Sequence, residues 1–193
     1  MSLHGLLLAA GAGTRMGTPK ALMRDDDGTS WLLRSVAVLR EGGCDAVTVV
    51  LGAEAERARA LLDRGQVRAV VADRWAEGMG ESLRAGLTAQ VASDAAAVLV
   101  SLVDLPDVSA DVVRRVAGAG ADHDLLARAA YDGVPGHPVL LGRHHWAGVA
   151  DAATGDRGAR DYLSTHDVVL VECGDLATGR DVDSPTLNQR GAE

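Results

Sequence analysis

The feature that most constrains this chain is a short apolar strand, residues 6–9, that runs directly into a glycine-rich loop. The loop carries three glycines and two basic residues: Gly11, Gly13, Gly17, Arg15 and Lys20. Glycines allow successive backbone N–H groups to converge on an anion, because no Cβ atom stands in the way. A guanidinium fork and a compact ammonium group add positive charge beside those N–H groups. The segment therefore predicts a loop that binds a polyphosphate.

The spacing of the glycines excludes the two best-known phosphate loops. The dinucleotide fingerprint needs G-x-G-x-x-G, whereas this chain has one residue more before Gly17. The P-loop needs Gly-Lys followed by Ser or Thr, but Lys20 follows a proline and precedes an alanine. The same glycines without a ligand would form an ordinary turn after a strand. The charges of Arg15 and Lys20 favour phosphate binding over that alternative.

Apolar β runs alternate with amphipathic helices along the rest of the chain. The predicted strands cover residues 6–9, 46–51, 67–72, 95–103, 125–130, 139–141 and 168–171. The predicted helices begin near Ser30, Glu54, Ser82, Ser109, Arg160 and Pro185. Continuous apolar strands between helices are typical of a mainly parallel sheet that is covered on both faces. We therefore expect an α/β fold with a doubly wound, mainly parallel (mixed) sheet, in a single domain over residues 1–193.

Composition and charge argue against several classes of binding partner. The formal net charge of -8 argues against a general binder of nucleic acid or of an anionic membrane surface. The two cysteines give neither a metal-ligand spacing nor a disulfide framework, which fits a reducing compartment. The N-terminus lacks the basic segment of a signal peptide, and no apolar run is long enough to cross a membrane. We expect a cytoplasmic protein with no nucleic-acid and no membrane partner.

A carboxylate follows the most apolar of the predicted strands. Asp104 comes at the end of residues 95–103, and Pro106 follows it closely. Ligands of open parallel sheets bind beyond the carboxyl ends of the strands, where the glycine loop also begins. A carboxylate oxygen suits Mg²⁺, which takes one or two carboxylates together with phosphate oxygens. Asp104 is therefore predicted to hold Mg²⁺, although an aspartate at this place could simply start a turn.

The glycine loop resembles the signature of the nucleotidyltransferases that act on the molybdenum cofactor. Residues 8–20 read Leu-Ala-Ala-Gly-x-Gly-x-Arg-Met-Gly-x-x-Lys, and the Ala-Ala-Gly form resembles the cytidylyltransferase branch rather than the guanylyltransferase branch. The resemblance implies a Rossmann-like nucleotidyltransferase fold. It also implies that the loop binds the nucleotide through Ala9, Ala10, Gly11, Gly13, Thr14, Arg15 and Lys20. Isoprenoid-pathway and sugar-phosphate nucleotidyltransferases carry related loops, so this motif alone indicates a superfamily.

Two more segments resemble elements of the same family around the nucleotide. Residues 77–87 resemble its glycine-rich entry to the helix beside the base, which implies nucleotide contacts from Gly78 and Ser82. Ser82 could equally serve as the cap of that helix. Residues 181–185 resemble its Asp-Ile-Asp-Thr-Pro element, which implies that Asp183 holds Mg²⁺ as well. Asp183 could instead cap a helix that begins at the following proline.

The segments 133–139 and 155–160 resemble motifs of the molybdenum cofactor cytidylyltransferases that the isoprenoid enzymes lack. The resemblance implies that His137, Arg157 and Arg160 bind the acceptor. Without the resemblance, His137 would be a structural hydrogen-bonding residue, and the two arginines would be solvated surface charges. The chain also departs from the family, with Leu105 where Gln or Met is frequent, and Asp73 where Asn is common.

These motifs together imply a Mg²⁺-dependent enzyme that transfers CMP from CTP to the terminal phosphate of a molybdopterin-type cofactor and releases pyrophosphate. Lys20, Arg15 and Asp104 would be the catalytic residues. CTP or another NTP and the molybdopterin-type cofactor would be the partners, and a recipient molybdoenzyme is a further candidate. The alternatives are a guanylyltransferase, another small-phosphate nucleotidyltransferase of the same fold, or a catalytically silent partner in molybdoenzyme maturation.

Overall fold

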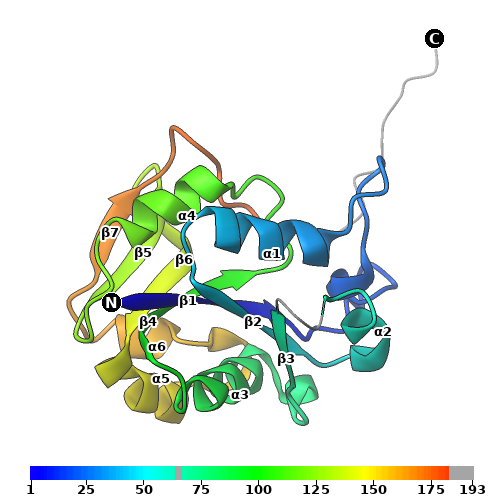
Figure 1. Ribbon diagram of the computed structural model, residues 1–193, viewed down its shortest axis with the longest axis horizontal. Helices are drawn as coiled ribbons and strands as arrows, with labels where there is room; N and C mark the ends of the chain where they lie inside the picture. The colour runs from blue at the N-terminus through cyan, green and yellow to red at the C-terminus, as the bar shows by residue number, and fades with distance from the viewer. Residues whose placement is uncertain (64–66, 183–193) are drawn as a thin grey trace.

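The computed structural model describes residues 1–63 and 67–182, and a seven-stranded sheet lies at its centre (Figure 1). The strands are β1 (Ser2–Ala9), β2 (Ala46–Leu51), β3 (Val67–Val71), β4 (Ala95–Leu102), β5 (Leu126–Tyr131), β6 (Val134–Gly142) and β7 (Val169–Glu172). Their order across the sheet is β3-β2-β1-β4-β6-β5-β7. The first four are mutually parallel, β6 runs antiparallel to β4 and β5, and β7 is parallel to β5. The predicted α/β fold with a mainly parallel, mixed sheet is confirmed.

Helices cover both faces of the sheet. They are α1 (Trp31–Glu41), α2 (Ala55–Arg59), α3 (Met79–Gln90), α4 (Ala110–Ala117), α5 (Trp146–Ala152) and α6 (Arg160–Leu163). Figure 1 shows α1 and α4 on one face and α3, α5 and α6 on the other. Successive side chains of a strand point to opposite faces. Leu7 of β1 accordingly packs in the core beneath α1 and α4, whereas Leu6 and Leu8 pack in the core beneath α3 and α5.

The helix α3 begins earlier than the sequence predicts, at Met79, with Gly78 as its N-cap. Gly78 has a φ angle of 117°, a conformation that side chains with a Cβ atom rarely adopt. Ser82 lies inside the first turns of the helix, so the interpretation of Ser82 as the helix cap is wrong. By contrast, Ser30 does cap α1, because its side chain accepts a hydrogen bond from the backbone N–H of Leu33.

The topology creates a crevice at one edge of the sheet. From β1 the chain proceeds to β2 and β3 on one side, and then returns to β4 on the other side of β1. Loops that leave the carboxyl ends of β1 and β4 therefore diverge in opposite directions and leave space between them. Both the glycine loop and Asp104 follow these two strand ends.

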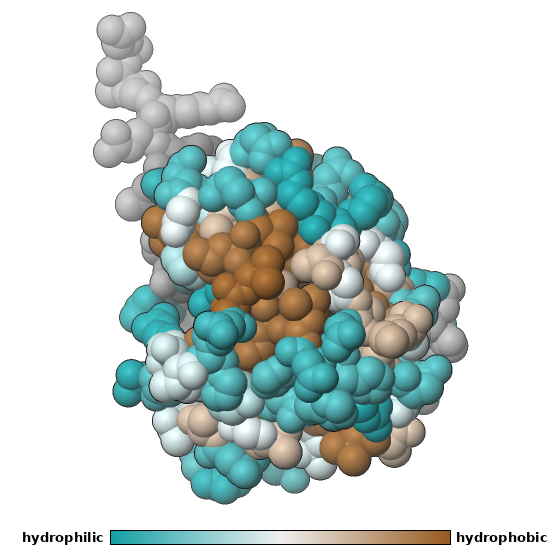
Figure 2. All heavy atoms as spheres, turned by 90° about the vertical axis from the view of Figure 1, so that its left-hand side faces the viewer, coloured by the Kyte–Doolittle hydropathy of each residue, from teal (hydrophilic) through white to brown (hydrophobic). Residues whose placement is uncertain are grey.

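The edge strand β7, at the side of the sheet away from β3, has an apolar surface. Figure 2 views the molecule from the side on which β7 lies and shows a broad hydrophobic area there. Val169 and Leu170 on this strand are 49% and 51% exposed. Within the described part of the chain, β7 is the last strand of the sheet. No helix of the described residues is both long and apolar enough to cross a membrane.

Candidate active site

The glycine loop leaves β1 and turns back before a short helical turn at Lys20–Leu22. Gly13 and Gly17 have positive φ angles of 59° and 72°. A Cβ atom on Gly13 would lie 2.0 Å from the carbonyl oxygen of Thr18, so only glycine fits at this position. The Cβ position of Gly11 has no neighbour within 4 Å, so the backbone there is open to a ligand.

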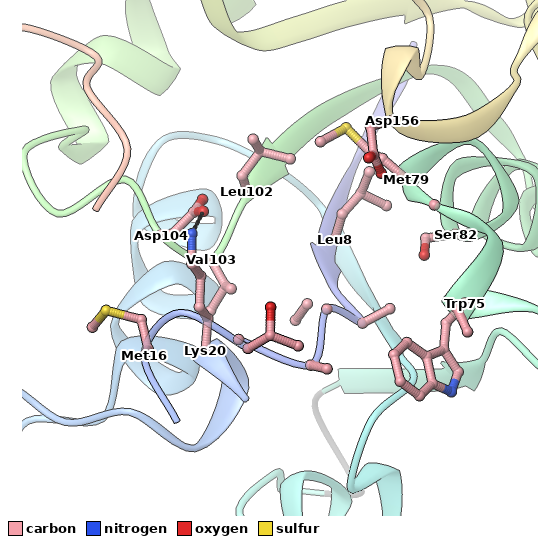
Figure 3. A pocket seen from close by; sticks show the side chains of 18 of the residues that line it. Leu8, Met16, Lys20, Trp75, Met79, Ser82, Leu102, Val103, Asp104 and Asp156 are labelled. Atoms are coloured by element: carbon pink, nitrogen blue, oxygen red, sulfur yellow. Dashed lines mark hydrogen bonds and ion pairs between the residues drawn. The ribbon is translucent and has the colours of Figure 1, made fainter. Parts of the chain in front are cut away.

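The loop forms one wall of a cavity of about 440 Å³ at the carboxyl ends of β1 and β4 (Figure 3). The turn Trp75–Glu77, the start of α3 and the residues that follow β4 form the other walls. The cavity brings together every residue predicted to contact nucleotide or metal, apart from Asp183: Ala9, Ala10, Gly11, Gly13, Thr14, Arg15, Lys20, Gly78, Ser82 and Asp104. Their roles in binding and catalysis remain predictions.

Lys20 and Asp104 face each other across one end of the cavity (Figure 3). The Nζ atom of Lys20 donates to Oδ2 of Asp104 at 2.6 Å, and their side chains are only 17% and 13% exposed. The other carboxylate oxygen, Oδ1 of Asp104, is buried and has no hydrogen-bond partner among the described residues. Leaving a carboxylate oxygen unpaired in a buried place is costly, so this atom is a candidate ligand for a cation.

The C-terminal segment of the described chain runs beside Asp104. The backbone N–H of Val182 donates to the carbonyl oxygen of Asp104 at 3.0 Å. Upstream, the carboxylate of Asp107 accepts hydrogen bonds from both the backbone N–H and the hydroxyl of Thr178, at 2.6 and 2.5 Å. Asp183, the second predicted metal ligand, lies outside the described residues.

The far end of the cavity carries the largest apolar side chains of its lining. Trp75, Met79 and Ser82 line it opposite Lys20 and Asp104 (Figure 3). The indole of Trp75 packs directly on the backbone of Gly52, since a Cβ atom there would lie 2.5 Å from Cγ of the indole. This end of the cavity therefore offers an aromatic surface and one hydroxyl group, a combination that suits a nucleobase.

The segment 154–158 packs on the start of α3 and joins the wall of the cavity. A Cβ atom on Gly78 would lie 2.4 Å from the carbonyl carbon of Gly155, so the two backbones are in direct contact. Arg84 of α3 fixes the preceding helix, because its guanidinium donates to the carbonyl oxygens of Ala150 and Ala153 at 3.0 and 2.8 Å. The carboxylate-bearing Asp156 consequently reaches the cavity lining.

His137, a predicted acceptor residue, lies on β6 beside the cavity and does not line it. Its peptide bond to Pro138 is cis, and its carbonyl oxygen accepts a hydrogen bond from the hydroxyl of Tyr131 at 2.7 Å. Burial, with the positive charges of Arg128 and Arg160, lowers the pKa of His137 to about 4. The imidazole is therefore neutral at pH 7.

The other two predicted acceptor residues differ in their surroundings. Arg157 is 64% exposed and pairs with the carboxylate of Asp161 at 2.6 Å. Arg160 begins α6, as the sequence predicts, and its charge acts on His137. Arg157 therefore lies in a local surface ion pair, whereas the charge of Arg160 contributes to the lowered pKa of His137.

Sequence reasoning missed several residues that the structure places at or beside the cavity. Met79 and Asp156 line it, and both lie inside segments whose other members were singled out. Arg128 also escaped notice, although a single arginine within the apolar run of residues 125–130 is an available signal. Trp75 lines the cavity and, partly buried, also packs against the core beneath α3 and α5.

Comparison with known proteins gives one family. The sequence model of the MobA-like NTP transferase domain matches residues 5–169. A protein named nicotine blue oxidoreductase, from Paenarthrobacter nicotinovorans, is 36% identical over an alignment of length 195 that covers 93% of this chain and 91% of the relative. A probable molybdenum cofactor guanylyltransferase from Rhodopirellula baltica is 37% identical over 109 residues, or 56% of this chain and 51% of that protein.

Two solved structures have a similar fold. The structure of Rv0371C from Mycobacterium tuberculosis H37Rv in complex with manganese is 28% identical, with a TM-score of 0.73 and 94% of each chain covered. A nucleotidyl transferase from Methanothermobacter has a TM-score of 0.75 at 21% identity, covering 95% of this chain and 92% of its own. The second likeness concerns the fold alone.

Proposed function

The chain belongs to the MobA-like NTP transferase domain family, and we propose that within it this protein transfers CMP from CTP to the terminal phosphate of a molybdopterin-type cofactor. Pyrophosphate is the second product. The observation that carries the proposal is the cavity at the ends of β1 and β4, with Lys20 and an open glycine loop on one side and a half-paired carboxylate on the other. A triphosphate needs donors and positive charge, and a cation bound to that triphosphate needs the free carboxylate oxygen.

A divalent metal ion fits the residues present. Oδ1 of Asp104 is a buried oxygen without a partner among the described residues, which is the donor that a hard cation requires. Asp104 would hold Mg²⁺, with Asp183 as the second carboxylate, and the manganese complex of the mycobacterial relative supports a divalent ion. When bound, the ion would neutralise charge on the phosphates of the nucleotide.

The protein's own groups would act mainly by position and charge. Lys20 and Arg15 would hold the pyrophosphate portion, with the loop N–H groups of Gly11 and Gly13 directed at the same oxygens. The acceptor phosphate is already an anion at neutral pH, so its attack on the α-phosphorus needs no general base. Placing the attacking oxygen in line with the leaving group is then the main catalytic task.

The identity of the nucleobase and that of the acceptor are proposed from short sequence motifs and from the relatives. The Ala9-Ala10-Gly11 form supports CTP, whereas the relative from Rhodopirellula is named a guanylyltransferase. His137, Arg157 and Arg160 would face the acceptor. The resemblance to proteins that act on the molybdenum cofactor supports a molybdopterin-type acceptor.

A redox reaction is the second candidate, because the relative that aligns with 93% of this chain is named an oxidoreductase. The phosphates of a dinucleotide could use the same glycine loop. Phosphoryl-group transfer uses both the ammonium group of Lys20 and the buried free oxygen of Asp104, which supports the first candidate.

One set of assays separates the two candidates. The purified protein is incubated with Mg²⁺, molybdopterin cofactor and each of the four NTPs, and pyrophosphate release is measured. In parallel, oxidation of NADH and NADPH is followed with the same cofactor and with quinone-type dyes. We expect pyrophosphate release with the highest kcat/KM for CTP. A clear preference for GTP would show that the assignment of CTP as the nucleotide substrate is wrong. Oxidation of NADH or NADPH without pyrophosphate release would show that the proposed transfer reaction is wrong.

A further inference from the structure

The two edge strands of the sheet differ in the side chains that they expose. At one edge, β3 exposes the charged Arg68, whose guanidinium donates to the carbonyl oxygen of Ala89 at 2.8 Å, and its other residues are partly buried. At the other edge, Val169 and Leu170 of β7 are about half exposed, and Val171 is partly exposed. A charged side chain on an edge strand discourages pairing with another chain, whereas an apolar edge strand favours it. β7 is therefore the edge at which a further strand can pair.

The backbone groups of alternate residues of β7 point toward β5. The N–H of Cys173, which directly follows the strand, donates to the carbonyl oxygen of Ala130 of β5 at 2.7 Å. Because the direction of the backbone groups alternates along a strand, the N–H and C=O groups of Val171 and Val169 point toward β5 as well. The groups of the residues between them point away from the sheet.

The outward-pointing backbone groups of this segment belong to Val168, Leu170 and Glu172. One of them is in contact with α4, since the guanidinium of Arg115 donates to the carbonyl oxygen of Glu172 at 3.0 Å. Over residues 1–63 and 67–182, no second strand pairs with β7. Leu170, the middle one of the three, therefore presents both an N–H and a C=O group at the free edge.

Both faces of β7 carry apolar side chains. Val171 packs partly against the core beneath α1 and α4, and Val168 packs partly against the core beneath α3 and α5. Since side chains alternate between faces, Val169 lies on the face of Val171, and Leu170 lies on the face of Val168. Figure 2 shows a hydrophobic area on the side of the molecule where β7 lies. A strand that pairs here must itself be apolar on both faces, and β7 of another copy of this chain meets that requirement.

The negative charge of Glu172 is compensated within the chain. Its carboxylate accepts hydrogen bonds from the backbone N–H groups of Asp132, Gly133 and Gly174, at 3.0, 3.0 and 2.8 Å. The side chain is therefore held against the turn between β5 and β6. Two copies of β7 can approach each other without leaving this carboxylate unpaired.

We propose that β7 pairs with β7 of a second copy of this chain, antiparallel about a two-fold axis at Leu170. This axis uses all three outward-pointing residues: the two Leu170 residues exchange their N–H···O bonds with each other, and Val168 exchanges them with Glu172 of the second copy. Val169 then lies opposite Val171 of the second copy, in the closely spaced pair between these hydrogen bonds. The contact is self-complementary, so it closes as a dimer and joins the two sheets.

The strength of this contact follows from its length. One short strand from each copy buries less area than a standard protein interface, so we expect a reversible dimer with a dissociation constant in the micromolar range. The test is sedimentation velocity of the whole protein over a dilution series from micromolar to near-millimolar concentration. The variants are Leu170→Lys and Leu170→Glu. Val91→Lys is the matched control, because Val91 is 62% exposed but lies at the end of α3.

We expect the wild type and Val91→Lys to dimerise with dissociation constants within about twofold of each other, because an isolated exposed residue contributes little. Leu170→Lys and Leu170→Glu should each dimerise at least ~10-fold more weakly, since two like charges then lie directly opposite each other at the axis. An equimolar mixture of these two variants should associate more strongly than either alone, because the ammonium group of one lies opposite the carboxylate of the other. A general loss of stability would not be reversed by mixing.

Four results would overturn the proposal: a wild type that stays monomeric, a dimer that persists in Leu170→Lys, an equal loss in Val91→Lys, or a mixture that associates no better than its components. Circular dichroism identifies any variant that fails to fold, and hydrogen exchange of the wild type then decides. Exchange of the Leu170 N–H should slow as the protein concentration rises, whereas that of the Val171 N–H, which points toward β5, should not change. Equal exchange of Leu170 at low and high concentration would also overturn the proposal.

Discussion

Gly78→Ala tests whether the two backbones that form the base end of the cavity are in direct contact. Gly78 has a φ angle of 117°, and an added Cβ atom would lie 2.4 Å from the carbonyl carbon of Gly155 and 2.6 Å from its oxygen. The unfavourable backbone conformation costs about 1–3 kcal/mol. The overlap with a backbone that cannot rotate away costs about 1–3 kcal/mol more. We therefore expect the free energy of unfolding to fall by roughly 2–6 kcal/mol.

Gly28→Ala is the control that isolates the contact. Gly28 also has a positive φ angle, 87°, but its Cβ position has no neighbour within 4 Å. This variant should lose only the conformational part, about 1–3 kcal/mol. For a chain of this size each kcal/mol lowers Tm by about 2–4 °C. The two variants should therefore differ by roughly 2–12 °C in Tm.

The assay is urea denaturation and thermal melting of both variants, followed by calorimetric titration of Mg·CTP. Gly78→Ala should also bind nucleotide more weakly, because the start of α3 and the segment 154–158 must move apart at the cavity wall. Gly28→Ala should bind it like the wild type. Equal stability of the two variants would refute the contact between Gly78 and Gly155.

Three further predictions concern the charged groups. Asp104→Asn should lower kcat by at least ~10²-fold, the scale of a lost preorganised electrostatic contact, with circular dichroism unchanged; activity within a few-fold at saturating Mg²⁺ would contradict the metal assignment. Lys20→Ala should weaken Mg·CTP binding, whereas His137→Ala should leave it nearly unchanged and impair turnover; loss of CTP binding in a folded His137→Ala protein would contradict this division. Because the pKa of His137 is lowered from 6.5 to about 4, the unfolded chain binds more protons between these values, so stability should fall as pH drops from 6.5 to 4. Urea denaturation at pH 7 and pH 5 should show a smaller loss for His137→Gln than for the wild type, and an equal loss would contradict the lowered pKa of this half-buried imidazole.

The sequence predicts strands best where both faces are buried. The run 46–51 is apolar throughout and forms β2 with the predicted bounds. The start of β1 was missed because Ser2 and His4 are polar, and only the folded protein supplies their partners: Asp45 for Ser2, and Gln90 and Asp94 for His4. Polar residues in a strand depend on such distant partners, which local patterns do not contain.

β6 shows a second limit of the sequence. Only residues 139–141 were predicted as a strand, because the glycine and two prolines before them normally interrupt a sheet. In the structure the strand extends from Val134 to Gly142, and the hydroxyl of Tyr131 binds the carbonyl oxygen of His137 in its middle. The antiparallel direction of β6 was also beyond local patterns, because direction depends on how the chain returns to the sheet.

The sequence order already indicates that the glycine loop and Asp104 converge, whereas the surroundings of His137 and Arg160 could not be predicted from it. The glycine loop and Asp104 each follow a strand end, and the carboxyl ends of parallel strands meet at one edge, so sequence order already predicts that they converge. Arg128, His137 and Arg160 come from two strands and a helix whose packing is not evident in sequence. The ion pair of Arg157, by contrast, is a local one. Its partner Asp161 is four residues further along the chain, and the pair lies at the surface.

The central claim is transfer of a nucleoside monophosphate to a phosphate acceptor, and isotope transfer tests it most directly. The protein is incubated with Mg²⁺, molybdopterin cofactor and CTP radiolabelled at the α-phosphorus. The products are then separated, the radioactivity of each is counted, and their masses are measured by mass spectrometry. We predict that the label moves to the cofactor, whose mass increases by one CMP unit, and that the pyrophosphate is unlabelled. If the label stays in CTP or is released only as free CMP while the cofactor keeps its mass, the account of this protein as a cofactor cytidylyltransferase is wrong.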